Sequence, residues 1–281
     1  DPYSHKLLSA ILPGRAQQKL LEPSAPLLSV KNLKVYFPIK KGLFRTTMDT
    51  IKAVDDISFE IAGAETFALV GESGSGKTTT AKAIVRLLSA KGQVILNGID
   101  LLKASQKTLR EQRANIQIIF QDPYSALNPR MTIGDSLKEG LKLQKTKHSF
   151  TEHLCLLDNL LKKVDLPVNI KKRYPHEFSG GERQRICLVR ALVLQPKVLI
   201  LDEPTSALDV SIQKQMLVLL ENLQKELGIT YLLITHDLGV VAYLAHRMAV
   251  MHQGKIVEQG ATERILANPQ NHYTKRLLTS L

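Results

Sequence analysis

Apolar and polar residues alternate along two early stretches of the chain, residues 27–37 and 51–61. Alternation with a period of two is typical of half-buried β-strands, so we expect two strands here. The residues between them, 38–50, are rich in basic side chains and contain Gly42, and we expect a basic loop. Residues 93–98 are predicted to form another strand that ends in a turn.

Four shorter runs are apolar almost without interruption. Such runs are expected where helices cover both faces of a parallel sheet. The four runs lie at residues 67–70, 116–120, 197–204 and 230–237. Residues 247–260 are predicted to form a β-hairpin instead, with Gln253 and Gly254 at its turn.

Helical spacing fills much of the remaining sequence. Residues 131–177 have a helical character, and Thr151–Val164 repeats apolar residues at steps of three and four, before a polar connection over 165–174. After Asp209, apolar residues again follow steps of four, three and four, at Met216, Leu220, Leu223 and Leu227. A short helical tail ends the chain. Strands that alternate with helices predict an α/β fold.

The segment Gly71–Thr78, GESGSGKT, connects an apolar strand to a helical pattern. It matches G-x-x-x-x-G-K-[ST], in which glycines let backbone N–H groups approach a polyphosphate. Lys77 is placed to neutralise the β- and γ-phosphates, and the Thr78 hydroxyl to ligate Mg²⁺. The alternative is a glycine-rich turn that binds nothing, which the flanking strand and helix make the weaker interpretation.

Two further segments have the same kind of chemistry. Asp202 and Glu203 follow a buried strand, where an α/β sheet places ligands. Asp202 is suited to hold Mg²⁺ and Glu203 to polarise an attacking water, although a pair of surface acids is the alternative. Ser179 is a good N-cap, and Gly180 and Gly181 leave backbone N–H groups uncovered at a second helix start. Alone, that segment would be a capped helix after a turn.

Composition narrows the class of partner. The chain has 281 residues and a net charge of +12, which favours anionic partners such as nucleotides, nucleic acid or an anionic membrane. The basic residues form small groups without interleaved aromatics, so no dedicated nucleic-acid surface is indicated. No apolar run reaches about 18 residues, so no membrane-spanning helix is predicted. Cys155 and Cys187 have no metal or redox spacing.

The two ends of the chain resemble one another. The first ten residues, DPYSHKLLSA, repeat the order of residue types in NHYTKRLLTS, Asn271–Ser280. We interpret residues 1–26 as the tail of a preceding copy of the same domain followed by a linker. The alternative is chance similarity. We expect this segment to be poorly ordered and the chain to be a piece of a longer cytosolic protein.

Six motifs stand in a fixed order: GESGSGKT, Gln121, SGGERQR, LILDEP, SALD (206–209) and His236 after a buried strand. In this order the chain resembles the nucleotide-binding subunit of an ATP-binding-cassette (ABC) transporter over residues 27–281. The resemblance implies a P-loop NTPase core with a mixed or parallel sheet, an antiparallel β subdomain, a helical subdomain at about 122–190 and a C-terminal extension at about 261–281.

The resemblance also implies roles for the matching residues. ATP phosphates would be bound by Gly71, Glu72, Ser73, Gly74, Ser75, Gly76, Lys77, Thr78 and Thr79. Mg²⁺ would be reached by Thr78, Gln121 and Asp202, with Glu203 as the base and His236 on the γ-phosphate. Ser179, Gly180, Gly181 and Asp209 would act on ATP held by an opposing domain, in a head-to-tail pair. An aromatic residue would stack on adenine; register suggests Phe37, but Tyr36 remains the alternative.

A narrower resemblance concerns the solute. FQDPYSALNPRMTI (120–133), YPHEFSGG (174–181) and the closing NHYTKRLL are similar to the dipeptide, oligopeptide and nickel branch of importers. The KKGLF insertion and the copied tail resemble the second half of a fused double ATPase, of the microcin C type of peptide importer. Phe178 and Glu182 depart from the commonest signature residues, Leu and Gln, around an intact Ser-Gly-Gly. A cysteine cluster found in some relatives is absent, so we expect no iron–sulfur cluster.

We therefore expect an ATPase that powers a membrane importer of peptides or similar small solutes. Its partners would be membrane-spanning subunits docked near 121–131, a second nucleotide-binding domain and, indirectly, a solute-binding protein, at the cytoplasmic face of the cell membrane. No nucleic-acid partner is expected. The alternatives are a soluble ABC ATPase acting on nucleic acid or the ribosome, and a nucleotide sensor without turnover, against which the intact Glu203 argues.

Overall fold

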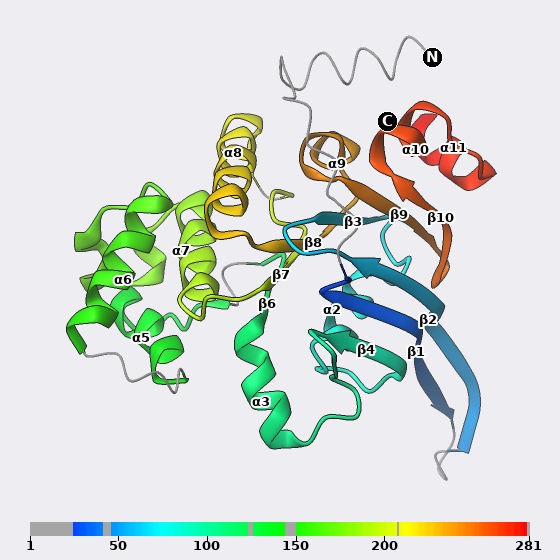
Figure 1. Cartoon of the computed structure of the whole chain (residues 1–281), viewed down its shortest axis with the longest axis horizontal. Helices are drawn as coiled ribbons and strands as arrows, with labels where there is room; N and C mark the ends of the chain where they lie inside the picture. Colours follow the sequence, from blue (N-terminus) through cyan, green and yellow to red (C-terminus); the bar gives the residue numbers. More distant parts are fainter. Residues whose placement is uncertain (1–24, 42–45, 123–125, 144–149, 207, 280–281) are drawn as a thin grey trace. The chain divides into compact units, whose positions relative to one another are not determined.

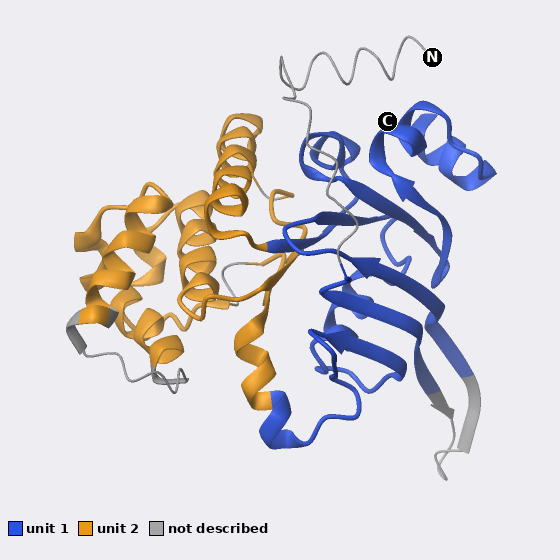
Figure 2. Ribbon diagram, viewed as in Figure 1, with its two compact units in different colours: residues 1–109, 230–281 blue, residues 110–229 orange. Residues whose placement is uncertain are grey.

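The computed structural model describes residues 25–41, 46–122, 126–143, 150–206 and 208–279. The chain divides into two compact units, which Figure 2 colours separately. Unit 1 comprises residues 1–109 and 230–281, and unit 2 comprises residues 110–229. Almost all of the predicted preceding-domain tail and linker, and its predicted poor order, lies outside the described residues.

Unit 1 contains the strands that the early alternation predicts, in the antiparallel sheet that the family resemblance implies. Its strands have the order β2 (Thr46–Ile61), β1 (Leu28–Lys41), β4 (Lys91–Leu96) and β5 (Ile99–Asp100). The strands β2, β1 and β4 lie side by side in Figure 1. In the early part of β1 the apolar residues face the core, and Leu28 and Val30 are completely buried. A turn with positive φ at Asn97 and Gly98 ends β4 as expected.

The predicted basic loop over residues 38–50 is wrong. β1 continues to Lys41 and β2 starts at Thr46, with pairs such as Pro38↔Thr50 and Lys41↔Thr46. β4 pairs with β1 only as far as Lys34, so the later part of β1 has an edge where proline, which lacks an N–H, is tolerated. The prediction took a basic sequence without regular alternation as a sign of a loop, whereas the backbone pairs as a strand there.

The second sheet region of unit 1 carries the glycine-rich loop. β3 (Thr66–Val70) pairs in parallel with both β8 (Thr230–Thr235) and β9 (Arg247–His252), and β10 (Lys255–Ala261) is antiparallel to β9. All residues of β3 and β8 are buried. Gln253 and Gly254 have φ angles of 46° and 79°, which confirms the predicted hairpin turn.

Short helices complete unit 1. They are α2 (Lys77–Ile84), α9 (Leu238–Leu244), α10 (Thr262–Ala267) and α11 (His272–Thr279), and α3 (Gln106–Asn115) crosses the boundary between the units. The helical tail predicted at the end of the chain is thus two helices.

Unit 2 has a two-stranded parallel core, β6 (Ile116–Ile119) and β7 (Val198–Asp202), and several helices. The helices α5 (Ile133–Leu143) and α6 (Phe150–Lys163) both pack on α7 (Gly180–Leu192) (Figure 1). The remaining helical elements are α8 (Val210–Leu227) and the 3₁₀ turns η1 (Val168–Lys172) and η2 (Pro175–Glu177). The predicted polar connection at 165–174 therefore contains one 3₁₀ turn, which buries Ile170.

Candidate functional site

The loop between β3 and α2 has a backbone that glycine adopts easily and other residues do not. Gly71, Gly74 and Gly76 have φ angles of 153°, 79° and 107°. A Cβ on Gly71 would lie 2.2 Å from the Met251 carbonyl oxygen, and one on Gly76 would lie 2.2 Å from that of Ala53. A Cβ on Gly74 would meet nothing within 4 Å. The loop is therefore tightly packed at both ends and open in the middle.

Lys77 folds its amine back into this loop. Its Nζ donates to the carbonyl oxygens of Gly71 at 2.7 Å and Glu72 at 2.9 Å, and lies 3.5 Å from Ser75 Oγ. The lysine is 6% exposed, whereas Glu72 and Ser73 at the rim are exposed. The loop thus has a positive charge held at a fixed place by its own carbonyl groups.

Helix α2 starts within the same motif. Its N-cap is Gly76, which offers no side-chain hydrogen bond, and the first N–H groups of any α-helix have no partner inside the helix. The first turn contains Lys77, Thr78 and Thr79, and both threonines are half-buried. Backbone donors, a helix dipole and an ammonium group therefore converge, which suits a phosphate.

His236 lies at the same edge of the sheet as the loop. β3 and β8 are parallel, and Val70 pairs with Thr235, so Gly71 and His236 each follow directly after their strand. His236 is exposed. The structure therefore brings the predicted histidine and the predicted phosphate loop to one edge of unit 1.

In unit 2, predicted site residues also follow the ends of two parallel strands. β6 and β7 are parallel, with Ile119 opposite Leu201, so Gln121 and the Asp202–Glu203 pair emerge together. Gln121 Nε2 donates to Glu203 Oε2 at 3.0 Å. Asp202 is 2% exposed, and Glu203 has a φ of 51°, an uncommon conformation for a non-glycine residue. This turn separates the two acids: one faces inwards and the other meets Gln121.

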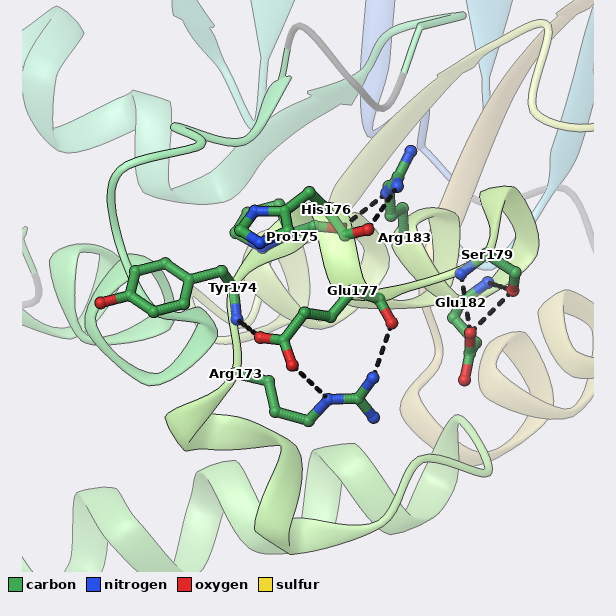
Figure 3. Close-up of polar contacts among 8 residues, drawn as sticks. All are labelled: Arg173, Tyr174, Pro175, His176, Glu177, Ser179, Glu182 and Arg183. Carbon is green, nitrogen blue, oxygen red and sulfur yellow. Dashed lines mark hydrogen bonds and ion pairs between the residues drawn. The ribbon is translucent and has the colours of Figure 1, made fainter.

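Ser179 caps α7 through a reciprocal pair of contacts (Figure 3). Its Oγ accepts from the Glu182 N–H at 3.3 Å, and a Glu182 oxygen accepts from the Ser179 N–H at 2.8 Å and from its hydroxyl at 2.8 Å. These bonds lower the pKa of Glu182, the backbone N–H being the larger cause. The predicted N-cap is confirmed, and Glu182 satisfies the capping-box requirement for Glu or Gln.

The segment before Ser179 is stabilised by contacts that the sequence did not predict (Figure 3). Glu177 accepts from the Tyr174 N–H at 2.6 Å, which lowers the Glu177 pKa, and from Arg173 Nε at 3.3 Å. Arg183 Nε donates to the Pro175 carbonyl oxygen at 2.7 Å. The charged residues of YPHEFSGGERQR thus shape the approach to α7, a role with no sequence signal beyond their proximity.

Phe178 has a structural explanation too. It is 4% exposed, and the Arg173 guanidinium carbon lies 4.3 Å from its ring centroid, a cation–π geometry. Both departures from the commonest signature, Phe178 and Glu182, therefore make intramolecular contacts that stabilise the turn.

The two signature glycines have different surroundings. A Cβ on Gly181 would lie 2.8 Å from Ile212 Cγ2, whereas one on Gly180 would meet nothing within 4 Å. Asp209, predicted to act across a domain interface, is the N-cap of α8, and it accepts from the N–H groups of Ser211 at 3.1 Å and Ile212 at 3.0 Å. Gly181 is thus needed for packing, and Gly180 leaves an open surface.

The two candidate adenine-stacking residues differ in their contacts. The Tyr36 hydroxyl donates to Asp55, a hydrogen bond that raises the tyrosine pKa. Lys52 Nζ lies 5.7 Å from the Tyr36 ring centroid. Phe37 is 39% exposed, against 37% for Tyr36. Tyr36 therefore makes polar contacts within the chain, whereas Phe37 is an apolar ring that is partly exposed to solvent.

The predicted Mg²⁺ ligands offer oxygen atoms, as this cation requires. Thr78 supplies a hydroxyl in unit 1, and Gln121 and Asp202 supply an amide and a carboxylate in unit 2. Within the described ranges, no three His, Cys, Asp or Glu side chains cluster in a way that could hold a metal. A few protein oxygens fit Mg²⁺, which keeps waters and binds substrate phosphates rather than needing a protein cage.

Fold and loop together define a nucleotide-phosphate-binding α/β protein. A family model described as ABC transporter matches residues 54–206, more than half of the chain, and the chain belongs to this family as an ATP-binding domain. The predicted family and α/β fold class are confirmed, and the use of ATP with Mg²⁺ is a general property of that family. Among the described helices, none is long and apolar enough to cross a membrane.

Curated relatives include importer components. The chain is 46% identical over 266 residues to the glutathione import ATP-binding protein GsiA of Escherichia coli O157:H7, covering 94% of this chain and 42% of that protein. It is 44% identical over 279 residues to the peptidoglycan transport ATP-binding protein YejF of Agrobacterium fabrum, covering 99% and 51%. The chain thus spans about half the length of the curated relatives it matches.

Solved structures with a similar fold include ATP-binding cassettes of the same family. The dimeric post-hydrolysis ATP-binding cassette MJ0796 bound to ADP and Pi is 26% identical, with a TM-score of 0.73 over 84% of this chain and 98% of that one. The protein cbiO1 from Clostridium perfringens, part of the ABC transporter complex cbiONQ, is 29% identical, with a TM-score of 0.74 over 87% and 92%.

Proposed function

We propose that this chain binds and hydrolyses ATP and powers a membrane importer of peptides or similar small solutes. The observation that carries the proposal is the phosphate loop, in which a buried Lys77 amine, two tightly packed glycines and an uncapped helix start converge. The importer assignment rests on the 43–46% identity to the ATP-binding proteins GsiA and YejF.

In this proposal the phosphates lie along the loop of residues 71–79. Lys77 provides the fixed positive charge, and the backbone N–H groups of the α2 first turn provide donors. Phe37 stacks on the adenine ring, which its exposed apolar face supports, since Tyr36 is tied to Asp55.

Glu203 is proposed as the base for hydrolysis. Thr78, Gln121 and Asp202 would hold Mg²⁺, which would neutralise the charge of the phosphates. Gln121 keeps the Glu203 carboxylate oriented through the 3.0 Å hydrogen bond. Glu203 accepts a proton from the attacking water, a task for which a correctly placed base contributes about 10²–10⁴ in rate.

Ser179, Gly180, Gly181 and Asp209 are proposed to complete the nucleotide site of a second nucleotide-binding domain, while His236 acts on the γ-phosphate in its own chain. The open surface at Gly180 and the dimeric MJ0796 cassette support this arrangement. Residues 27–281 would form one such domain. Relatives of about twice the length support a fused partner copy, with residues 1–26 as its tail and linker, as in the microcin C type.

The remaining partners follow from importer function. Membrane-spanning subunits would dock near Gln121, and a solute-binding protein would act indirectly. The chain would then be peripheral, at the cytoplasmic face of the cell membrane. The helices α5 and α6, within the proposed helical subdomain at about 122–190, follow this docking region in the sequence.

The substitution Glu203→Gln tests the proposal. It keeps the size of the side chain and the acceptor for Gln121 but removes the base, so phosphate release should fall by at least about 10²-fold. Affinity for Mg·ATP, measured by titration calorimetry, should stay within about twofold, because Glu203 is not placed in phosphate binding.

The matched control is Glu226→Gln, the same change on α8 at a residue that pairs with Lys163. It should leave both turnover and affinity unchanged. Undiminished turnover in Glu203→Gln would remove Glu203 from the mechanism. Failure of the unsubstituted chain to bind Mg·ATP would contradict the proposed function as a whole.

A further inference from the structure

The C-terminal helix α11 touches the phosphate loop through one side chain. The Glu72 N–H donates to the hydroxyl of Tyr273 at 3.4 Å, across 201 positions in the sequence. Tyr273 is 7% exposed, and its burial raises its pKa. Both residues belong to unit 1. A buried hydroxyl is unfavourable unless it is hydrogen-bonded, so tyrosine rather than phenylalanine at this position needs a polar partner.

A second contact connects the same ring to the loop through the β9–β10 hairpin. The rings of Tyr273 and His252 have centroids 3.8 Å apart at 31°. His252 lies next to Met251, whose carbonyl oxygen leaves no room for a Cβ on Gly71. On the other side of the turn, the Gly254 N–H donates to the Ser75 carbonyl oxygen at 3.0 Å. The hairpin therefore contacts both the loop and α11.

The start of α11 is itself fixed to β10. The Glu258 carboxylate accepts from the Gln270 N–H at 2.8 Å and from the Asn271 N–H at 3.1 Å. Burial opposes ionisation of Glu258, but these hydrogen bonds, together with Thr274 and the charge of Arg264, outweigh it and lower the pKa of the carboxyl. Asn271 Oδ1 in turn accepts from the Tyr273 N–H at 2.8 Å. Glu258 and Asn271 thus hold the backbone at the start of the helix that carries Tyr273.

Glu72 connects Tyr273 to the lysine that neutralises phosphate. The Glu72 carbonyl oxygen accepts from Lys77 Nζ at 2.9 Å, while the N–H of the same residue donates to Tyr273. A residue held on both sides has fewer orientations available than one held on one side. The position of the Lys77 amine therefore depends on whether the Tyr273 hydroxyl is present.

We propose that Tyr273 is a positioning residue for the phosphate loop, and that α11 is a support on which nucleotide affinity depends. The inference rests on the proposed ATP binding by that loop. It assigns to the C-terminal extension a role in this chain's own nucleotide site. Tyr273 acts through Glu72 and Lys77 and contacts no nucleotide itself.

The test is Tyr273→Phe, which deletes the hydroxyl and keeps the ring against His252. We expect the dissociation constants for Mg·ATP and Mg·ADP, measured by titration calorimetry, to rise together by about three- to tenfold, the value of about one net hydrogen bond. The matched control is Thr279→Val. That change removes a hydroxyl from the same helix, where it donates to the Lys275 and Arg276 carbonyl oxygens, and it should leave both constants unchanged.

A second variant separates positioning from general stability. Glu258→Gln weakens the attachment of α11 and should also raise both dissociation constants. If Glu258 acts only through Tyr273, combining Glu258→Gln with Tyr273→Phe should add less than the sum of the two effects in ln Kd. Hydrogen exchange at the Glu72 amide, in the nucleotide-free protein, should be faster in Tyr273→Phe than in Thr279→Val.

Unchanged affinity in Tyr273→Phe, with an unchanged melting temperature or with a lower one, would overturn the inference. Full additivity of the two substitutions would also overturn it, because Glu258 would then act independently of Tyr273. Lys77→Ala distinguishes this failure from failure of the proposed function. If Lys77→Ala weakens binding while Tyr273→Phe does not, ATP binding by the loop stands and the support by α11 does not.

Discussion

A hydrogen bond connects Gln121 and Glu203, to which the sequence analysis assigns separate roles. The motif order predicts Gln121 as a metal ligand and Glu203 as a base, and the structure joins their side chains at 3.0 Å. The left-handed backbone of Glu203, with a φ of 51°, turns this carboxylate away from the direction of the buried Asp202. Conformations of this kind persist when the surroundings hold them, and they often occur at functional sites.

The loop glycines allow a prediction about stability. In Gly76→Ala, a Cβ would be forced into a positive-φ backbone and to within 2.2 Å of the Ala53 carbonyl oxygen. We expect the free energy of unfolding in urea to fall by about 1–3 kcal/mol. Gly63→Ala is the matched control, because a Cβ there meets nothing within 4 Å. It should be neutral or stabilising by up to about 1 kcal/mol, and an equal loss in both variants would contradict the argument.

At the scale of elements, two helices of unit 2 are capped by residues that were assigned to a second nucleotide. Ser179 caps α7 and Asp209 caps α8. A capped start is formed before any ligand arrives, so these side chains are held in place rather than recruited. Binding by Ser179 would then replace its contact with Glu182, which accepts from the same hydroxyl at 2.8 Å.

The capping box of α7 predicts a pH dependence. The folded-state pKa of Glu182 is lowered from 4.5, so its ionised form adds stability above about pH 4.5 that is lost as the pH falls through the folded-state value. The melting temperature of the wild type should therefore exceed that of Glu182→Gln at pH 7, by an amount that shrinks below about pH 4.5. Thermal unfolding without nucleotide, from pH 3 to 8, measures this difference.

Ser179→Ala supplies the control for that measurement. It removes the hydroxyl that exchanges hydrogen bonds with Glu182, and loss of such a cap costs about 1 kcal/mol. In the Ser179→Ala background, the pH-dependent effect of Glu182→Gln on the melting temperature should become smaller. An effect that stays constant down to pH 3 in the otherwise unsubstituted chain would show that the carboxylate does not support the helix start.

The sequence predicted the elements whose pattern reflects burial. The apolar runs correspond to β3, β6, β7 and β8, and the turn at Gln253–Gly254 is present. It missed α3, because that helix is mostly polar and Leu109 is its only fully buried residue. The candidate site residues could also be predicted, because their motifs stand in a recognisable order. Contacts between distant positions, such as Tyr273 with Glu72, could not be predicted, because they leave no periodic pattern in the sequence.

At the scale of the molecule, the proposal predicts that two nucleotide-binding domains associate when ATP is bound. In the Glu203→Gln protein, which should hold ATP without hydrolysing it, we expect Mg·ATP to double the mass measured by light scattering. The reason is that Ser179 and Gly180 of one copy would meet the phosphates bound to the other. A mass that stays monomeric although calorimetry detects bound ATP would mean that a different domain is the natural partner.

The matched control adds a charge to the surface at Gly180. A Cβ there meets nothing within 4 Å, so Gly180→Asp in the Glu203→Gln background should fold and bind ATP normally. Its carboxylate would face the triphosphate of the opposing copy, and like charges repel. Pairing should therefore be lost, and a dimer that persists would exclude this helix start from the interface.

The contact between α11 and the phosphate loop also affects how shortened versions of this chain should be interpreted. The family match ends at residue 206, and all six recognisable motifs end by His236, well before Tyr273. A truncation after β10 would keep these six motifs, and it would still leave Glu72 without the hydroxyl that accepts from its N–H. Weak ATP binding by such a fragment would reflect the missing helix rather than defective chemistry. If α11 supports the loop as proposed, the smallest unit that binds nucleotide at full strength extends beyond the residues that the family model matches.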